Sequence, residues 1–276
     1  MPDRTILITG STAGVGRYLA ERLAARGENL LLHGRDQGKL DRLVGELGGG
    51  GLGARLVPYV ADLASLDDVR ALAERVAKDH DRLDVLVNNA GIGSGNPGPD
   101  RHLSADGNEL RFAVNYLAPV LLTRLLLPLL KAAAPARIVN EGSLGQDSID
   151  FDDLRMDRRY NGTLAYCRSK LALAAWSFDL AEELRGDRVA VNCIHPATFM
   201  DTDMVRDAGV TPWSTVEDGG DAVLRLVDEG PAVTGRFFDG RSESRAHADA
   251  YDDTVRRRLR EATAELLPGI RGQGAG

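Results

Sequence analysis

Near its start the chain reads Thr9-Gly10-Ser11-Thr12-Ala13-Gly14-Val15-Gly16, directly after a short aliphatic run and directly before a run with helical spacing. The first turn of a helix carries free N–H groups and the positive end of the helix dipole, so it attracts phosphate groups. A side chain at the closest approach would block a phosphate, and glycine has none. A tight turn without a ligand would also use glycines. The place of this glycine-rich segment between a strand and a helix nevertheless favours a site for the pyrophosphate of a dinucleotide.

Short apolar runs and longer runs of helical period alternate along the rest of the chain. Strands are predicted at residues 5–9, 29–33, 54–60, 85–88, 137–140, 189–194 and 235–238, and helices at residues 15–26, 37–47, 66–79, 108–133, 164–184 and 217–228. This alternation is typical of βαβ units, which build a parallel sheet covered by helices on both faces. We therefore predict an α/β fold, a doubly wound parallel sheet of Rossmann type that binds ligands at the carboxyl ends of its strands. A single domain is expected over residues 1–268, followed by a disordered tail at residues 269–276.

The composition excludes several classes of protein. Of the 276 residues, 43% are hydrophobic and 27% are charged, which is ordinary for a globular chain. The formal charge of −7 argues against binding to nucleic acid or to an anionic membrane, because both need a basic face. We expect no signal peptide and no membrane span, and interpret the most apolar segment, residues 118–130, as a buried helix. Because the chain has only two cysteines, we expect a reducing compartment and a cytoplasmic protein.

Several motifs along the chain together resemble those of the short-chain dehydrogenase/reductase family. In the family's order they are the glycine spacing of residues 9–16, Asp62-Leu63 after the third strand, Asn88-Asn89-Ala90-Gly91 after the fourth, Asn115 in the long helix, Ser143 after the fifth strand, and Tyr166-x-x-x-Lys170. The resemblance covers about residues 4–240. It implies a nicotinamide-dependent oxidoreductase. It also implies that the cofactor contacts Gly10, Ser11, Thr12, Gly14, Val15, Gly16, Asp62, Leu63, Asn89, Ala90, Gly91, Tyr166, Lys170, Pro196 and Thr198.

The end of the second strand bears on the choice between NAD(H) and NADP(H). An acidic residue there binds the ribose 2′-hydroxyl of NAD(H), whereas a nearby arginine accommodates the 2′-phosphate of NADP(H). Here Gly34 stands at the acidic position, and Arg35 follows with a planar guanidinium that suits a phosphate. Asp36 is the competing ribose ligand, but we expect it to cap the helix that follows. Although Arg35 could be an ordinary solvated charge, we favour NADP(H) over NAD(H).

Tyr166 and Lys170 lie four positions apart in a helical run, so their side chains emerge on one face of the helix. A free tyrosine has a pKa of about 10, and a nearby ammonium group favours the phenolate that acid–base chemistry needs. A tyrosine and a lysine at this spacing also occur by chance, but the other motifs favour a catalytic pair. The resemblance assigns proton transfer to Tyr166, and it assigns both the tuning of that tyrosine and a ribose contact to Lys170. It also implies that Ser143 donates to the substrate oxygen and that Asn115 holds a water.

The chain departs from the family pattern at three places. Glu141-Gly142 precedes the serine where two apolar or small residues are usual, and we expect the carboxylate to point to solvent, with the active site as the alternative. Pro196-Ala197 replaces a Pro-Gly and Thr202 lies one position late, which leaves the carboxamide contacts of this loop open. Ser143 and Tyr166 are 23 positions apart, a spacing more similar to the retinol-dehydrogenase-like and bacterial reductase branches.

These motifs predict hydride transfer between NADP(H) and a ketone, an aldehyde or a secondary alcohol. The alternatives are an epimerase or dehydratase with a tightly held cofactor, and a sensor that only binds dinucleotide. The intact serine, tyrosine and lysine weigh against the sensor, because binding alone does not need them. A small-molecule substrate is expected beside the loops 93–105, 147–162 and 198–214.

The remaining predictions concern partners, cysteine and metal. Relatives often pair through their two long helices, here residues 108–133 and 164–184, so a homo-oligomer is expected. Cys167 is placed in the core rather than at the site, because consecutive helical residues point about 100° apart. The histidines, His195 included, show no metal-ligand spacing with cysteines or carboxylates, and no metal is expected.

Overall fold

In the computed structural model, which describes residues 4–48, 53–95 and 100–269, one sheet runs through the protein. Its strands are β1 Thr5–Ile8, β2 Asn29–Gly34, β3 Leu56–Val60, β4 Val85–Asn88, β5 Ala136–Glu141, β6 Val189–His195, β7 Arg236–Asp239 and β8 Ser242–Ser244. They lie in the order β3-β2-β1-β4-β5-β6-β7-β8, with β1 to β7 parallel and β8 antiparallel to β7. The predicted α/β fold with a doubly wound parallel sheet is confirmed. Residues 270–276 of the predicted tail lie outside the described ranges.

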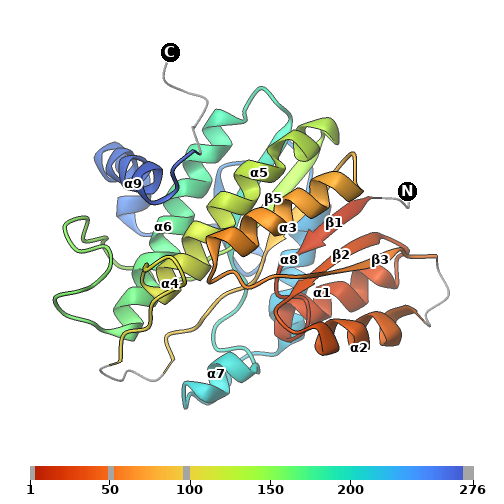
Figure 1. Cartoon of the computed structure of the whole chain (residues 1–276), viewed down its shortest axis with the longest axis horizontal. Helices are drawn as coiled ribbons and strands as arrows, with labels where there is room; N and C mark the ends of the chain where they lie inside the picture. Colours follow the sequence, from red (N-terminus) through yellow and green to blue (C-terminus); the bar gives the residue numbers. More distant parts are fainter. Residues whose placement is uncertain (1–3, 49–52, 96–99, 270–276) are drawn as a thin grey trace.

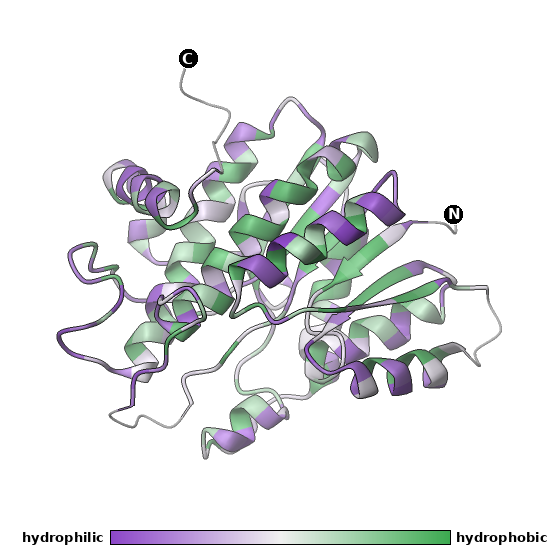
Figure 2. Ribbon diagram, viewed as in Figure 1, coloured by the Kyte–Doolittle hydropathy of each residue, from purple (hydrophilic) through white to green (hydrophobic). Residues whose placement is uncertain are grey.

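The helices, most of which pack against the two faces of this sheet, are drawn in Figure 1. They are α1 Gly14–Ala24, α2 Gln37–Gly48, α3 Leu66–Asp79, α4 Leu110–Phe112, the π-helical turn η1 Ala113–Leu117, α5 Ala118–Ala132, α6 Gly162–Glu183, α7 Asp203–Asp207, α8 Val216–Asp228, the 3₁₀ turn η2 Ala248–Tyr251 and α9 Asp253–Leu266. One core cluster joins α1, α2 and α8 to side chains such as Ile8 and Val139. The other joins α3, α5 and α6 to side chains such as Leu7 and Ile138. Neighbours along a strand therefore point to opposite covered faces, which explains the continuous apolar strands visible in Figure 2.

Among the described residues, one helical run, Leu110–Ala132, is long and apolar enough to cross a membrane by length and composition. It consists of α4, η1 and α5, and 78% of its most apolar window is buried inside the protein. The core helix predicted at residues 118–130 is therefore observed. The π-helical turn within this run carries Asn115, and such turns occur frequently at functional sites.

The strand order reverses beside β1, which lies between β2 and β4. In a doubly wound sheet, the connections on the two sides of such a point lie on opposite faces, and a crevice opens at the carboxyl ends of the strands. The glycine-rich turn follows β1 at this edge. The segments after β4, β5 and β6 reach the same edge because all these strands are parallel. The fold therefore gathers most of the predicted site residues along one end of the sheet.

Candidate active site

The glycine-rich turn enters α1 without any side chain capping the helix. Ala13 is the N-cap residue and makes no side-chain hydrogen bond, so the first N–H groups of α1 are open to a ligand. Gly10 and Gly14 have φ values of +67° and +51°, in a region that L side chains rarely adopt. A Cβ on Gly16 would overlap the main-chain oxygen of Gly10. The three glycines therefore make a turn that brings backbone donors close to a bound anion.

Two of the predicted cofactor residues have side chains beneath this turn. Ser11 is fully buried, and both its N–H and its hydroxyl donate to the main-chain oxygen of His33, at 2.8 Å and 3.1 Å. Val15 is buried in the core cluster of α1. The N–H of Gly10 donates to Nδ1 of His33 at 3.2 Å. Buried side chains thus hold the turn in shape from below, whereas Thr12 is partly exposed.

The end of β2 carries a buried glycine and an exposed arginine. A Cβ on Gly34 would lie 3.0 Å from the side chain of Thr12, so an acidic side chain does not fit there without displacing that residue. Arg35 is exposed and follows directly. Asp36 accepts a hydrogen bond from the N–H of Lys39 at 2.8 Å, which confirms the prediction that it caps α2.

The motif after β4 ties that strand to the glycine-rich turn. Nδ2 of Asn89 donates to the main-chain oxygens of Thr9 at 2.6 Å and Gly10 at 3.1 Å. The N–H of Ala90 donates to the hydroxyl of Thr9 at 3.0 Å. A Cβ on Gly91 would lie 3.2 Å from Asn115 Oδ1 and 3.7 Å from Lys170 Nζ. Glycine at this position therefore lets the backbone pass close to two of the predicted catalytic residues.

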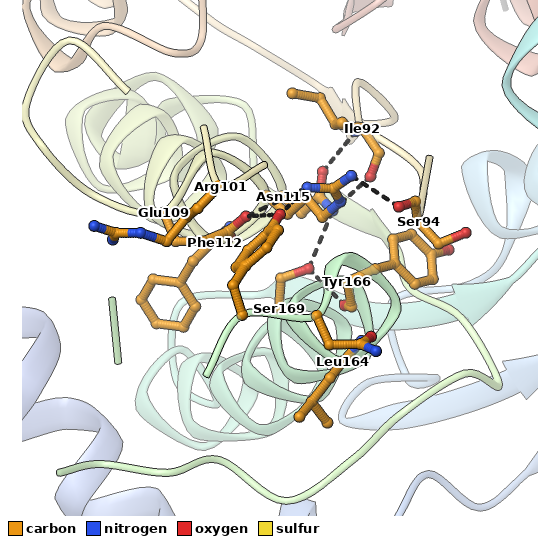
Figure 3. A network of polar contacts seen from close by, with 12 residues as sticks. Ile92, Ser94, Arg101, Glu109, Phe112, Asn115, Leu164, Tyr166 and Ser169 are labelled. Carbon is orange, nitrogen blue, oxygen red and sulfur yellow. Dashed lines mark hydrogen bonds and ion pairs between the residues drawn. The ribbon is translucent and has the colours of Figure 1, made fainter. Parts of the chain in front are cut away.

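Asn115 connects the segment after β4 with α6 (Figure 3). Its Oδ1 accepts from the N–H of Ile92 at 2.8 Å, and its Nδ2 donates to the oxygen of Ile92 at 3.0 Å and to Ser169 Oγ at 3.0 Å. The hydroxyl of Ser169 donates in turn to the main-chain oxygen of Tyr166 at 2.7 Å. This side chain therefore fixes the helix of Tyr166 against the backbone that follows β4. The water expected at Asn115 stays a prediction.

The structure brings the serine, tyrosine and lysine together beyond the carboxyl end of β5. Lys170 lies one turn after Tyr166 in α6, and its Nζ is 5.7 Å from the centroid of the tyrosine ring. The same Nζ donates to the main-chain oxygen of Glu141 at 2.7 Å, which holds the ammonium group in place. A Cβ built on Gly145 would lie 3.4 Å from Ser143 Oγ and 3.7 Å from the Tyr166 ring. The serine hydroxyl and the tyrosine ring therefore flank one small space.

The prediction that Glu141 points to solvent is wrong. The residue is 7% exposed, because β5 continues one residue beyond its predicted end and keeps Glu141 inside the sheet. Burial raises the pKa of the Glu141 carboxyl to about 8, and the charge of Lys170 opposes this rise. Its Oε1 atom is buried and has no hydrogen-bond partner among the described groups.

Asp62 and Leu63 follow β3, and Pro196 and Thr198 follow β6, at the two ends of the site. Asp62 is exposed and Leu63 is buried. Pro196 is also buried, whereas Thr198 is partly exposed and its hydroxyl lies 3.0 Å from Nε2 of His195. Burial lowers the pKa of His195.

The loop that continues from β6 reaches back over the turn. A Cβ on Gly14 would lie 3.2 Å from the methyl carbon of Thr202, which directly precedes α7. Met204 of α7 packs against Gly93, where a Cβ would lie 2.6 Å from the methionine Cγ. This loop therefore contacts both the turn after β1 and the segment after β4.

Arg111 is a site residue that sequence reasoning missed. It is 7% exposed, and it donates through Nε to the oxygen of Gly93 at 2.8 Å and through Nη2 to the oxygen of Ser94 at 2.8 Å. Its Nη1 donates to the hydroxyl of Tyr160, which donates to Glu109 at 3.2 Å. This network joins two of the predicted substrate loops, 93–105 and 147–162. Ser94 and Glu109 appear in Figure 3 near Asn115.

Large apolar side chains are exposed in the segments that follow β5 and β6. This apolar rim consists of Leu144, Phe199, Met204 and Trp213, and Trp213 is 75% exposed. Phe199 and Trp213 pack edge to face with ring centroids 5.0 Å apart. Exposed apolar clusters of this kind often mark binding surfaces.

The other candidates from the sequence have lesser roles. Cys167 is half-buried rather than in the core, and burial raises the pKa of its thiol, which disfavours a thiolate nucleophile. Within the ranges that the structure describes, no three His, Cys, Asp or Glu side chains gather as ligands for a metal ion.

The arrangement suits a dinucleotide and a carbonyl compound together. The uncapped start of α1 and its strained glycines provide a cradle that a side chain would fill. The buried Glu141 Oε1 has no hydrogen-bond partner among the described residues. Ser143 and Tyr166 offer two hydroxyl groups beside a fixed cation. These residues therefore fit a nicotinamide cofactor held between the turn and α6.

Known proteins match this chain over most of its length. Residues 4–212 match the sequence model of a family described as short chain dehydrogenase. Human retinol dehydrogenase 13 is 35% identical over 297 residues, which cover 99% of this chain and 88% of that protein.

Two solved bacterial structures are similar as well. A short chain dehydrogenase from Pseudomonas syringae is 30% identical with a TM-score of 0.70, and the match covers 86% of this chain and 94% of that one. A short chain dehydrogenase from Shigella flexneri, complexed with NADP, is 28% identical with a TM-score of 0.72 and covers 88% of this chain and 98% of that one.

Proposed function

The chain belongs to the short-chain dehydrogenase family, in a branch similar to the retinol dehydrogenases, and from this premise we propose that it transfers a hydride between NADP(H) and an apolar aldehyde, ketone or alcohol. The observation that carries the proposal is the meeting of Ser143, Tyr166 and Lys170 at the carboxyl end of β5, next to the segment that follows β4. A binding protein would not need this set. A cytoplasmic location and a homo-oligomer remain predictions.

Each residue of the set has a role that its position supports. When bound, NADP(H) gives or accepts the hydride at its nicotinamide ring. The Tyr166 hydroxyl gives a proton to the substrate oxygen during reduction and takes it back during oxidation. Ser143 donates a hydrogen bond to the same oxygen, where negative charge grows as the carbonyl is reduced. Lys170, held by the main-chain oxygen of Glu141, places a positive charge beside the tyrosine ring.

The end of β2 favours NADP(H) over NAD(H). Gly34 is buried against Thr12, so no carboxylate stands there to bind a ribose hydroxyl or repel a phosphate. Arg35 is exposed beside it and can form a bidentate pair with a 2′-phosphate. Asp36 already caps α2. The NADP complex of the similar Shigella protein agrees with this choice.

The apolar rim favours an apolar substrate. Leu144 directly follows Ser143, and the other three side chains belong to the segment after β6, where Met204 lies in α7. The similar human protein is named as a retinol dehydrogenase, and retinol is an apolar alcohol. The loop 147–162 adds charged side chains at the same edge, so the substrate's polar end is expected to lie inward at Tyr166.

Replacement of Tyr166 tests the proposed function. Tyr166→Phe keeps the ring and removes the transferable proton, so NADPH oxidation with a panel of apolar aldehydes and ketones should fall by about 10²–10⁴-fold. The dissociation constants of NADP+ and NADPH should change by less than about threefold, since no phosphate contact is altered. Tyr59→Phe, in β3 and away from the site, is the matched control and should keep full turnover.

Other results would point to the alternative functions. Near-full turnover in Tyr166→Phe would contradict the acid/base role. A cofactor that survives purification of the native protein, without net NADPH consumption, would favour an epimerase or dehydratase. Cofactor binding without any turnover across the panel would favour a sensor.

A further inference from the structure

Glu141 is a buried acid beside the site to which the proposed reaction gives only a main-chain role. Its carboxyl is enclosed at the end of β5, and its Oε1 atom lacks a partner among the described residues. Native proteins rarely leave a buried acceptor unpaired without a functional reason. Resting on the proposed function, we propose that the Glu141 carboxyl lies against the nicotinamide half of the cofactor and discriminates between its oxidised, cationic form and its reduced, neutral form.

The alternation of β5 places this side chain on the face of the glycine-rich turn. Ile138 packs in the core of α3, α5 and α6, and Val139 packs in the core of α1 and α8. Because side chains alternate along a strand, Glu141 shares the face of Val139. Asn140 pairs with Asn88 of β4, so Glu141 comes level with the next residue of that chain, which is the asparagine that binds Gly10.

A dinucleotide in this site has to span that position. Its pyrophosphate is expected at the uncapped start of α1, and its reactive ring must reach Ser143 and Tyr166. The carboxyl ends of β4 and β5 lie between these two points. Glu141 is two residues before the serine, and its own main-chain oxygen holds Lys170. The carboxyl therefore lies on the route that the nicotinamide half must take.

Charge determines what a carboxyl at this place does. In a buried site of low dielectric constant, a carboxylate attracts a cationic ring strongly and a protonated carboxyl does not. Burial raises the pKa of Glu141 to about 8, so the free protein holds it mostly protonated at pH 7. A cationic ring would favour the carboxylate and expel the proton, whereas a neutral ring would not.

Other titratable groups face the same region and have to be separated from Glu141. Lys170 acts on Glu141 from α6, and its Nζ lies over the ring of Tyr166. The same lysine and Asp239 of β7 act on His195 at the end of β6. The 2′-phosphate of the cofactor also titrates, with a second pKa of about 6 in related phosphates. NADP+ and NADPH both carry this phosphate. Its contribution therefore cancels when the protons released on binding of the two cofactors are compared.

Calorimetric titration at pH 7 in two buffers of different ionisation enthalpy measures the protons released on binding. In the native protein, NADP+ binding should release up to about one proton more than NADPH binding. In Glu141→Gln this difference should vanish, and NADP+ affinity at pH 9 should fall by about 10-fold or more, the loss expected for a charge-assisted contact. NADPH affinity should change by less than about threefold. Glu141→Val also removes the buried charge, so it should fold and behave in the same way if the glutamine variant does not fold.

Two controls identify the source of the proton. Tyr166→Phe should keep the extra proton, because that proton comes from Glu141. Glu28→Gln should keep it as well, since Glu28 is another buried glutamate with an unpaired oxygen but precedes β2 at the opposite end of the sheet, paired with Arg4. An unchanged proton difference in both Glu141 variants, or its loss in either control, would overturn the inference. Failure of the native protein to bind either cofactor would contradict the proposed function instead.

Discussion

At the end of β2, two adjacent residues discriminate between NADP(H) and NAD(H) in different ways. Gly34 leaves no room for an acid, and Arg35 supplies an exposed cation. Arg35→Ala should therefore weaken NADPH binding by roughly 10- to 150-fold, the loss of a charge-assisted pair, and leave NADH within about twofold. Fluorescence titration of both reduced cofactors measures this. Lys39→Ala removes another exposed cation of the same region and should affect neither; equal losses of NADPH and NADH in Arg35→Ala would show that Arg35 does not read the phosphate.

His33 gives the site a dependence on pH through the stability of the turn. Its Nδ1 accepts from Gly10 and its Nε2 lies 3.1 Å from the oxygen of Ala61, a pattern that requires the neutral ring with its proton on Nε2. Burial lowers the pKa of His33 to about 4. Below its unfolded pKa of about 6.5, the unfolded chain binds the proton and the folded chain does not, so stability falls as pH falls toward 4.

Replacement of His33 should remove that part of the pH dependence. The native free energy of unfolding should fall by about 3 kcal/mol between pH 7 and pH 4 through this one group, in addition to the contributions of other groups. His33→Asn should show a slope that is shallower by about this amount in urea unfolding at a series of pH values. His247→Asn, at a partly exposed histidine, is the control. Parallel slopes in native protein and His33→Asn would contradict the buried neutral ring.

At the scale of elements, two glycines of the turn between β1 and α1 have different roles. Gly16 is needed for the packing of α1 on the sheet as well as for dinucleotide binding, whereas Gly14 matters mainly for binding. Gly16→Ala would drive a Cβ into the oxygen of Gly10 and to within 2.5 Å of Asn89 Nδ2, so α1 could no longer sit on the sheet. Gly14→Ala meets only the methyl of Thr202, at 3.2 Å, and adds the strain of a positive φ of about 1–2 kcal/mol. We expect Gly16→Ala to lower the melting temperature far more than Gly14→Ala, while both weaken dinucleotide binding by at least about 10-fold. Scanning calorimetry and cofactor titration measure the two effects; equal stability losses would contradict this division.

The predicted strands and helices agree with the structure where the regular spacing of apolar residues matches the spacing of buried residues. Strands and helices from β1 to β7 appear within a few residues of their predicted bounds because both faces of the sheet are covered. The pattern did not predict α9, since only Arg256 and Leu259 of that helix are buried and most of its other residues are polar. Nor did it predict α7, which has five residues and no buried side chain. The π-helical turn at Asn115 lies inside a helix predicted as regular, because hydropathy does not report the local hydrogen-bond pattern.

The sequence predicted those parts of the site in which a recognisable motif directly follows a predicted strand. Ser143, Tyr166 and Lys170 meet because parallel strands bring their following segments to one edge. The Arg111 network was not predictable, since Tyr160 lies 49 positions further along and only the fold places it beside the arginine. The prediction for Glu141 was wrong because the predicted strand ended at residue 140, whereas β5 ends at Glu141. A side chain that still belongs to a strand of a sheet covered on both faces is buried.

At the scale of the molecule, α6 links the site to the outer surface of the fold. Tyr166 and Lys170 belong to this helix. Its outer side is covered by η2 and α9, which contact it through the stacked rings of Phe178 and Tyr251 and the ion pair of Arg256 with Asp179. The predicted homo-oligomer was expected to use this helix together with α5. Most residues of both helices are buried within the chain, and the homo-oligomer stays a prediction.

Cofactor binding should be visible in the stability of the whole molecule. A ligand that binds only the folded state stabilises it by about 2.7 kcal/mol at 100 times its dissociation constant, and each kcal/mol raises the melting temperature of a chain of this size by about 2 °C. NADPH at that excess should therefore raise the melting temperature by about 5 °C, and NADH at the same concentration by less than about 2 °C. In Arg35→Ala the NADPH shift should fall to about 3 °C or less, because the same concentration is then only about 10 times the dissociation constant or lower. Differential scanning fluorimetry measures all three shifts in one experiment. Equal shifts for NADPH and NADH in the native protein would contradict the preference for the phosphorylated cofactor while leaving the dinucleotide site itself intact.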